Sequence, residues 1–456
     1  MIDRLDAFVS SKSEEFISLL KDFLVIPSVS AGVSSGSAMR EAVGWVQRQL
    51  RGCGLDAVIA ETGGHPAVLA DSGPAEGPGP TVLVYGHYDV QPVGEEALWH
   101  SPPFVPTLRE GAVYARGAAD DKGQLLTHIL AARAFREVSG RLPVRVKYLI
   151  EGEEEVGSSH LAALVEDRRQ QLECDFVVLS DTAKFDETTP AITYGTRGLV
   201  YKQLTLCGPK HDLHSGSFGG TVLNPGNVLG RVLSGLKDAE ERIAIAGCYD
   251  DVRPLSAEEH QALEALPFDE QAYLRSTGSP ALSGEQGYTT LERRWVRPTL
   301  DVNGVFGGFM GSGASTVIPA RVGAKVSMRL VPDQRPERVS QAFDEAVRAL
   351  VPPGVSLELE TLALAEPYMC PIDSPQIRAA VAAMKGGFQR DPVLIREGGT
   401  LPILPLFRRV LGADSVMMGF CSPNCNAHGP NEFLGVEDFL AGIRTVVRFL
   451  DLLARA

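Results

Sequence analysis

Short apolar runs that end in polar residues recur along the first 200 residues of the chain. Three of these runs have the length of buried strands, and between the first two lies a stretch with apolar residues at helical spacing. The strands are expected over 81–89, 144–155 and 175–181, and the helix over 121–138. Strands that alternate with helices predict an α/β fold in which helices flank a mixed sheet.

The pattern changes after about residue 195. Longer alternating runs predict strands at 198–208, 321–332 and 355–364, with helices at 224–242 and 335–351. The order of strand, helix, strand, helix and strand is typical of a small α+β domain. Between the first helix and the second strand lies an acidic segment, 249–295, that is expected to be irregular.

The α/β pattern returns near the end of the chain, with an apolar strand expected at 414–420 and an amphipathic helix at 436–456. We therefore expect a discontinuous larger domain made of residues 1–195 and 372–456. The smaller α+β domain, residues 196–371, is inserted into it. A chain of 456 residues is long enough for two separate cores.

Composition excludes several classes of partner. The net charge of −14 argues against nucleic acid or an anionic membrane as a partner, because both require a basic face. No run of about 18 apolar residues predicts a membrane span. The N-terminal 20 residues contain early acids and predict an amphipathic helix, not a signal peptide. Seven scattered cysteines indicate reduced thiols and a cytoplasmic location.

Residue types that bind metals follow the predicted strands. Alone, a histidine at a strand end is more often structural, and a glutamate cluster is more often a solvated face. Several such groups at several strand ends are explained together by one cation site, because ligands bind outside the carboxyl ends of strands in open α/β sheets. The residues concerned are His87, Asp89, the glutamates of 151–155, Asp181, His428, Asp120 and Asp121.

Charge balance favours two metal ions. Two Zn²⁺ ions are neutralised by three carboxylates and one hydroxide, which leaves one neutral imidazole for each ion. Asp89 lies two residues after His87 and points the same way in an extended segment. It is therefore expected to accept the second imidazole N–H of His87 and to set its tautomer. Glu151 is expected to support the site, and Glu153 to face outward.

Five motifs are similar to those of the co-catalytic di-zinc metallopeptidases. That family includes carnosine-type dipeptidases, aminoacylases, acetylornithine deacetylase and succinyl-diaminopimelate desuccinylase. The motifs occur in order across nearly the whole chain, which makes the resemblance more specific than one short pattern. They are HYDVQP at 87–92, YARGAADDKG at 114–123, EGEEEVGS at 151–158, LSD at 179–181 and AHGPNE at 427–432.

The resemblance implies two Zn²⁺ ions per subunit, although Mn²⁺ and Co²⁺ accept similar ligands. His87 and Asp181 would bind one ion, and His428 and Glu155 the other. Asp120 would bridge both ions, and its peptide bond to Asp121 would be cis. Glu154 would be the general base, which takes a proton from the attacking water and delivers it to the leaving amine.

The resemblance extends into the inserted domain, which would serve as lid and dimerisation domain of a homodimer. His214, in HDLHSG, would reach the active site of the partner subunit and stabilise the oxyanion. Arg329 would hold a terminal carboxylate with Thr316 nearby, and Gly399 and Thr400 would offer further donors. A salt bridge within the lid is the alternative for Arg329. The roles of His211 and Arg197 stay open.

The predicted function is a zinc-dependent dipeptidase that hydrolyses dipeptides or short peptides with a free C-terminal carboxylate, through a metal-bridging hydroxide. The alternative within the family is an N-acyl amino acid amidohydrolase of the deacetylase or desuccinylase type, because both cleave an amide beside a carboxylate. A non-catalytic binding protein on the same fold would have lost Glu154 or a metal ligand, and neither is missing.

Overall fold

The computed structural model describes residues 1–32, 36–75, 77 and 79–455. The chain divides into two units. The first comprises Met1–Tyr194, Cys370–Ile395 and Ile403–Ala456, and the second comprises Gly195–Met369 and Arg396–Pro402. The second unit therefore interrupts the first in sequence, and a short segment near residue 400 returns to it.

The first unit is built on a mixed sheet with the strand order β1-β2-β6-β3-β7-β17-β8. The four strands β6, β3, β7 and β17 run parallel, whereas β1, β2 and β8 pair antiparallel with their neighbours. The strands are β1 (Asp56–Ala60), β2 (Ala67–Asp71), β3 (Thr81–His87), β6 (Arg145–Glu151), β7 (Phe176–Leu179), β8 (Ala191–Thr196) and β17 (Asp414–Gly419).

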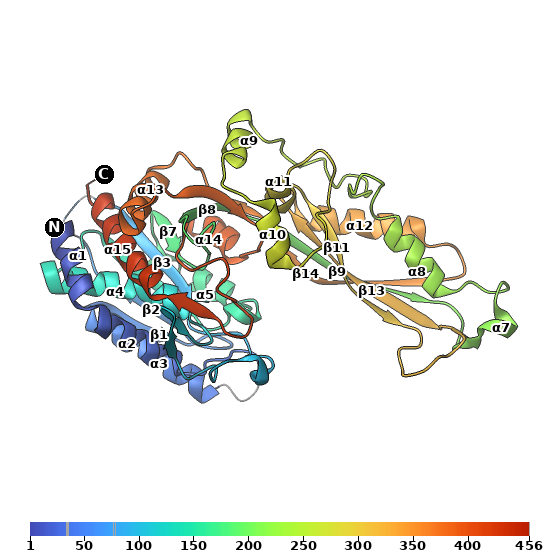
Figure 1. Ribbon diagram of the computed structural model, residues 1–456, viewed down its shortest axis with the longest axis horizontal. Coiled ribbons are helices and arrows are strands. Elements are labelled where there is room, and N and C mark those ends of the chain that lie inside the picture. The colour runs from blue at the N-terminus through green and yellow to red at the C-terminus, as the bar shows by residue number, and fades with distance from the viewer. Residues whose placement is uncertain (33–35, 76, 78, 456) are drawn as a thin grey trace. The chain divides into compact units, whose positions relative to one another are not determined.

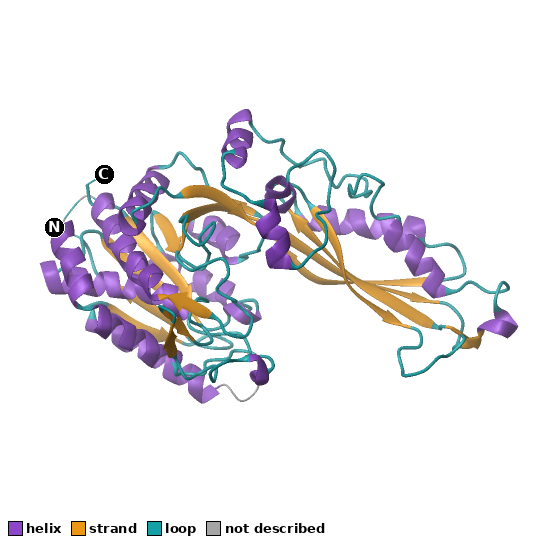
Figure 2. Cartoon of the chain, in the orientation of Figure 1, coloured by secondary structure: helices purple, strands orange, loops and turns teal. Residues whose placement is uncertain are grey.

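Helices cover both faces of this sheet, as Figures 1 and 2 show. On one face the hydroxyl of Tyr148 donates to the backbone oxygen of His128 in α4 (Lys122–Ser139). On the other face the ring of Phe407 in α14 (Ile403–Leu411) packs edge-on against Tyr85 at 5.4 Å. The two tyrosines point to opposite faces because the cross-strand partner of Tyr85 is Leu149, the residue after Tyr148. The predicted mixed sheet flanked by helices is confirmed.

The helices of the first unit are α1 (Ile2–Ser11), α2 (Ser13–Leu24), α3 (Gly36–Gly52), α4 (Lys122–Ser139), α5 (Leu161–Asp167), α6 (Arg169–Leu172), α13 (Pro375–Phe388), α14 (Ile403–Leu411) and α15 (Val436–Leu453). None of the helices in the described residues is long and apolar enough to cross a membrane. A small antiparallel sheet, β18-β5-β4, joins β4 (Thr107–Arg109) and β5 (Ala112–Tyr114) to β18 (Phe433–Gly435).

The second unit is an antiparallel sheet with the order β11-β13-β9-β14, and helices α8 and α12 cover one of its faces. Its core is formed by side chains that alternate along the strands, such as Val326 and Met328, and by Phe343 of α12. The main elements are β9 (Gly198–Cys207), β11 (Thr299–Gly307), β13 (Arg321–Leu330), β14 (Ser356–Ala365), α8 (Pro225–Ser234) and α12 (Pro336–Leu350).

Two expectations for the second unit are wrong in detail. The helix expected over 224–242 ends at Ser234, and the chain after it turns back so that Lys237 bridges to Ile243. The acidic segment is not irregular throughout, because it contains α9 (Ala257–Glu264), α10 (Glu270–Thr277) and α11 (Thr290–Trp295). Capping boxes start α9 and α11, and their S-x-x-E and T-x-x-E spacing is visible in the sequence.

His128 is a buried titratable group on α4. Its ring Nε2 lies 2.8 Å from the hydroxyl oxygen of Ser180, and the ring is not exposed to water. Burial lowers the pKa of His128 to about 3, so the folded protein holds this imidazole neutral.

Because His128 is held neutral in the folded state, lowering the pH should destabilise the folded protein. Because histidine in an unfolded chain titrates near pH ~6.5, protons bind the unfolded state first as the pH falls below that value. Between pH 7 and pH 5 we expect the free energy of unfolding of the wild type to fall by about 2 kcal/mol more than that of a His128→Asn variant. Urea denaturation at both pH values measures the difference, and parallel pH curves would contradict it.

Candidate metal centre

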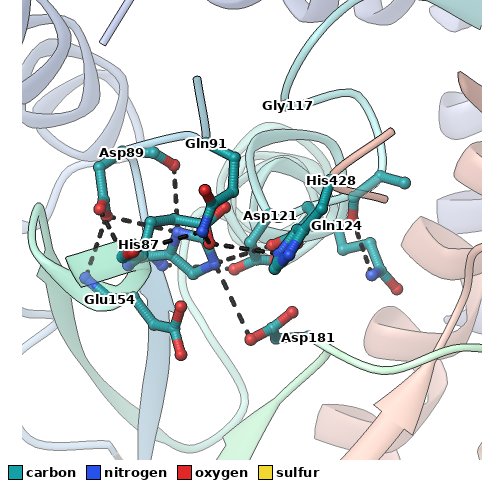
Figure 3. Close-up of polar contacts among 12 residues, drawn as sticks. His87, Asp89, Gln91, Gly117, Asp121, Gln124, Glu154, Asp181 and His428 are labelled. Atoms are coloured by element: carbon teal, nitrogen blue, oxygen red, sulfur yellow. Dashed lines mark hydrogen bonds and ion pairs between the residues drawn. The ribbon is translucent and has the colours of Figure 1, made fainter. Parts of the chain in front are cut away.

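Parallel strands bring the predicted ligands to one edge of the sheet. His87 is the last residue of β3, Asp181 follows β7 by two residues, and Glu155 lies in a 3-10 turn after β6. His428 belongs to the loop between β17 and β18. Because the carboxyl ends of parallel strands meet at the same edge, residues from distant parts of the sequence converge there, as Figure 3 shows.

Asp120 lies between two imidazoles. Its Oδ1 is 3.1 Å from Nε2 of His87, and its Oδ2 is 2.9 Å from Nε2 of His428. Asp181 Oδ2 lies 3.8 Å from the same nitrogen of His87, and Glu155 Oε2 lies 3.3 Å from that of His428. The donor atoms in each group of three lie within 4.8 Å of one another. Two groups of donors therefore share one carboxylate.

The donor set fits divalent cations. The side-chain Nε2 of His87 is buried, and its contact with Asp120 lacks the geometry of a hydrogen bond, so it makes none with the described residues. Burial raises the pKa of Asp181 to about 7, so ionisation of this carboxylate needs a compensating charge. Carboxylates and imidazoles at this spacing match the oxygen and nitrogen ligands of zinc-type ions.

The pKa values of the two histidines also reflect an excess of negative charge at the site. Burial lowers the pKa of His87, but the carboxylates of Asp120 and Asp89 outweigh this effect and raise the pKa well above its ordinary value. The carboxylates of Asp120 and Glu155 raise the pKa of His428 to about 10. The negative charge around both rings attracts protons, as it would attract a cation. The peptide bond between Asp120 and Asp121 is cis, as the resemblance implies.

Asp89 does more than orient His87. Its backbone oxygen lies 3.1 Å from Nδ1 of His87, closer than its carboxylate oxygen at 3.4 Å. The carboxylate instead accepts hydrogen bonds from the backbone N–H groups of Glu154 at 3.3 Å and Glu155 at 3.1 Å. Asp89 thus couples the strand that carries His87 to the turn that carries both glutamates.

Glu432 is the last residue of the AHGPNE motif, and the sequence alone predicts no role for it. It is completely buried and accepts four hydrogen bonds, all from one loop. The donors are Arg116 Nη1 at 2.7 Å and the backbone N–H groups of Gly117, Ala119 and Asp120 at 2.9, 2.9 and 3.0 Å. The only signal for this pair in the sequence was that both residues lie within motifs that carry predicted metal ligands.

The remaining glutamates of EGEEEVGS are both structural. Glu151 is buried and accepts from the hydroxyls of Tyr85 at 2.6 Å and Ser158 at 2.9 Å. The expectation that Glu153 faces outward is wrong, since its exposed fraction is only 8%. Its carboxylate contacts Nδ1 of His160 at 2.8 Å and accepts from the backbone N–H of His65. The chain after β6 turns back toward the β1–β2 connection, which the local sequence does not reveal.

The second unit brings Arg329 together with the segment near residue 400. Arg329 Nη1 donates to the hydroxyl of Thr400 at 2.7 Å. The backbone N–H of Arg197 donates to the backbone oxygen of Gly399 at 2.9 Å, and its Nε donates to that of Gly398 at 3.1 Å. The expected salt-bridge alternative for Arg329 has no support among the described residues, where no carboxylate lies within ion-pair distance of it.

Thr316 lies beside His214 and not beside Arg329. The strand β10 (Leu213–His214) pairs with β12 (Val317–Ile318), and the backbone N–H of Ser215 donates to the backbone oxygen of Thr316. This pair lies at the start of β13, whereas Arg329 lies at its end. Strand residues rise by about 3.3 Å each, so roughly 25 Å separates the two positions. Sequence reasoning placed Thr316 near Arg329 because it could not measure this length.

Comparisons with known proteins find similarity over nearly the whole chain. The sequence profile of the peptidase family M20/M25/M40 matches residues 83–452. The chain is 32% identical over 471 residues to the Cys-Gly metallodipeptidase dug1 of Schizosaccharomyces pombe, covering 99% of this chain and 98% of that protein.

Two solved structures are similar throughout. Human carnosine dipeptidase 1 matches with a TM-score of 0.86 and 30% identity, over 100% of this chain and 99% of that one. An M20 family metallo-carboxypeptidase from Sulfolobus solfataricus matches with a TM-score of 0.87 and 32% identity, over 97% of this chain and 100% of that one.

The Arg116–Glu432 pair should contribute strongly to stability. In a Glu432→Gln variant the amide nitrogen would face hydrogen-bond donors, and the buried guanidinium of Arg116 would lose its counter-charge. We expect a loss of about 3–5 kcal/mol in the free energy of unfolding, measured by urea denaturation. The double variant with Arg116→Gln should lose less than the sum of the two single losses. Additive losses would show that the two groups do not interact.

Proposed function

Since this chain belongs to the peptidase family M20/M25/M40 and is a metal-dependent dipeptidase, we propose that it cleaves dipeptides or short peptides with a free C-terminal carboxylate. The observation that carries the proposal is the shared position of Asp120 between two donor groups at the edge of the sheet. A site of this kind activates water and polarises an amide carbonyl at the same time.

The proposed cofactor is a pair of Zn²⁺ ions, with Mn²⁺ or Co²⁺ as substitutes that accept similar ligands. His87 and Asp181 would hold one ion, Glu155 and His428 the other, and Asp120 both. When bound, such a pair lowers the pKa of a shared water and stabilises negative charge on the substrate oxygen. The assignment of one imidazole to each group is supported by the distances around Asp120.

Glu154 is the proposed general base. Its carboxylate belongs to neither group of ligand donors, whereas that of the adjacent Glu155 belongs to one. The hydrogen bond from its backbone N–H to Asp89 holds it at the entrance of the 3-10 turn. From this position it would take a proton from the attacking water and deliver it to the nitrogen of the leaving amine.

Arg329 and the segment Gly399–Thr400 are the proposed carboxylate site. The guanidinium has one Nη on the hydroxyl of Thr400 and keeps further N–H groups for a substrate. A terminal carboxylate accepts two parallel hydrogen bonds from such a group. Recognition of the free carboxylate would limit the enzyme to the C-terminal end of short peptides.

His214 and Thr316 are proposed to act in the partner subunit of a homodimer. They lie together, about one strand length from Arg329 in the same unit, so they are poorly placed to contact the substrate that Arg329 holds. The strand β11 is at the edge of its sheet, with Val305 61% exposed, and Met310 just after it is 74% exposed. An apolar edge strand is a surface for pairing with another chain.

A cytoplasmic location is also proposed. All seven cysteines lie among the described residues, and each is a free thiol. Reduced thiols are the usual state in the cytosol.

Removal of Glu154 should abolish turnover without removing metal. We expect the Glu154→Ala variant to keep its metal content, because the ligands are untouched, and to lose at least ~100-fold in kcat on dipeptides. Amine release measures turnover, and mass spectrometry of the elements measures metal. A Glu166→Ala variant, which removes an exposed glutamate of α5, is the matched control and should retain wild-type kcat.

The wild type should be assayed on dipeptides and on N-acetyl and N-succinyl amino acids side by side. We expect turnover of the dipeptides. Turnover of the acylated amino acids alone would replace the dipeptidase proposal by the amidohydrolase alternative.

For the Glu154→Ala variant, a kcat equal to that of the wild type would contradict the role of Glu154.

Mixed dimers test whether His214 acts in trans. Neither a His214→Ala nor an Asp120→Ala variant should be active alone. Co-expressed chains form mixed dimers in which one site receives an intact His214 from the Asp120→Ala chain. With random pairing we expect about one quarter of wild-type activity. No recovery, with mixed dimers demonstrated by differential tags, would show that His214 does not act across the dimer.

A further inference from the structure

The second unit contains a cavity of about 440 Å³ beneath the acidic segment 249–295. This volume is within the range of about 300–1,000 Å³ that is usual for small-molecule sites. The helices α10 and α11 supply one wall and the start of β11 supplies another. Among the lining residues are Arg197, Tyr273, Arg294, Thr299 and Asp301.

The strand register places Arg329 beside this cavity. Thr299, which lines the cavity, is the cross-strand partner of Arg329 in the β11–β13 pair. Directly opposite residues of an antiparallel pair point to the same face of the sheet. Arg197 lies two residues before Leu199, which is the partner of Arg329 on β9. Since residues two apart in an extended chain share a face, Arg197, Thr299 and Arg329 all belong to the face that the cavity adjoins.

Several cations of the cavity wall already have partners. Lys237 Nζ is paired with Glu241 at 3.2 Å, and Arg297 makes a paired contact with Glu285 at 2.7 and 2.8 Å. Arg293 donates from Nε to the backbone oxygen of Glu285. These side chains are used within the fold.

Three guanidinium groups have no carboxylate within ion-pair distance in the described residues. Arg197 donates to the backbone oxygen of Gly398 and to the hydroxyl of Thr299, and Arg329 donates to Thr400. Arg294 lies over the ring of Tyr273 at 5.6 Å. These three guanidinium groups lie at one end of the sheet, and no carboxylate of the described residues forms an ion pair with them, although burial of an unpaired charge is costly.

The electrostatics of Arg197 reflect this cluster. Burial, and then the charge of Arg329, lower the pKa of Arg197 to about 10, and Arg294 contributes in the same direction. The carboxylates of Glu397 and Asp301 oppose the shift, each by less than Arg329 contributes to it. An anion with two negative charges would relieve the repulsion, because one carboxylate at Arg329 leaves Arg197 and Arg294 without a directly paired carboxylate.

We propose that Arg197 and Arg294 bind the side-chain carboxylate of an acidic C-terminal residue of the substrate, aspartate or glutamate. The inference rests on the proposed function, in which Arg329 binds the α-carboxylate of the same residue. The face shared by Arg197 and Arg329 puts the two carboxylate sites next to each other, as the two carboxylates of one amino acid require. The cavity gives the side chain room, and the ring of Tyr273 packs behind Arg294.

Matched substrates test the proposal on the wild type. Ala-Glu and Ala-Gln have nearly the same shape and differ in the charge of the side chain. Charge-assisted hydrogen bonds to two guanidinium groups should raise kcat/KM for Ala-Glu by about 10- to 100-fold over Ala-Gln, mainly through KM. Equal kcat/KM for the two substrates overturns the inference and leaves the dipeptidase proposal in place. Failure to cleave any dipeptide contradicts the dipeptidase proposal instead.

Paired variants assign the preference to this cavity. In Arg294→Gln the ratio of kcat/KM between Ala-Glu and Ala-Gln should fall to about one-tenth of its wild-type value or less, because one of the two donors is lost. Lys237→Gln is the matched control, since it removes one positive charge from the same wall at a side chain that is already paired. It should keep the wild-type ratio. An equal fall in both variants would indicate a general charge effect and overturn the assignment, and thermal unfolding verifies that both variants are folded.

Discussion

The carboxylate of Asp120 lies between two imidazoles, and much of the first unit is arranged around that contact. A carboxylate has two oxygens, and here one faces His87 and the other faces His428. The parallel strands deliver the first histidine, and the loop after β17 delivers the second. Glu432 accepts a hydrogen bond from the backbone N–H of Asp120 and also forms a buried ion pair with Arg116. The position of one side chain thus depends on two sheets and a buried charge pair.

In the second unit the predicted functional residues lie at opposite ends of long strands and do not meet at one place. Its antiparallel strands carry Arg329 at one end and lie next to His214 and Thr316 at the other. Because a whole strand separates Arg329 from His214 and Thr316, these residues are poorly placed to contact the same substrate within one subunit. The proposal therefore includes a second copy of the chain. The acidic segment over the Arg329 end adds α10 and α11, and with them Arg294. The segment 249–295 is acidic overall, so its composition gives no indication of the arginines that line the cavity beneath it.

The sequence revealed the parallel strands of the first unit as continuous apolar runs, and the strands β9, β13 and β14 of the second unit as alternating runs. The strands β3, β6, β7 and β17 are continuous apolar runs because helices cover both sides of a parallel sheet. The strand β11 was missed although β14, at the other edge of the same sheet, was predicted, because β11 contains Asn303 and Gly304 at an irregularity in its pairing, and neither residue type is common in strands. The end of α8 was missed because apolar residues continue beyond Ser234 although the chain turns there.

The sequence by itself determined the fold class and the set of metal-binding residue types, since both follow from periodicity and from motifs a few residues long. Tertiary structure alone decided which of those residues share a site. It paired Thr316 with His214, turned Glu153 inward, and grouped Arg197 with Arg294 and Arg329. These outcomes depend on sheet order, strand register and the return of distant loops, and periodicity along the chain carries no measure of the distance between segments.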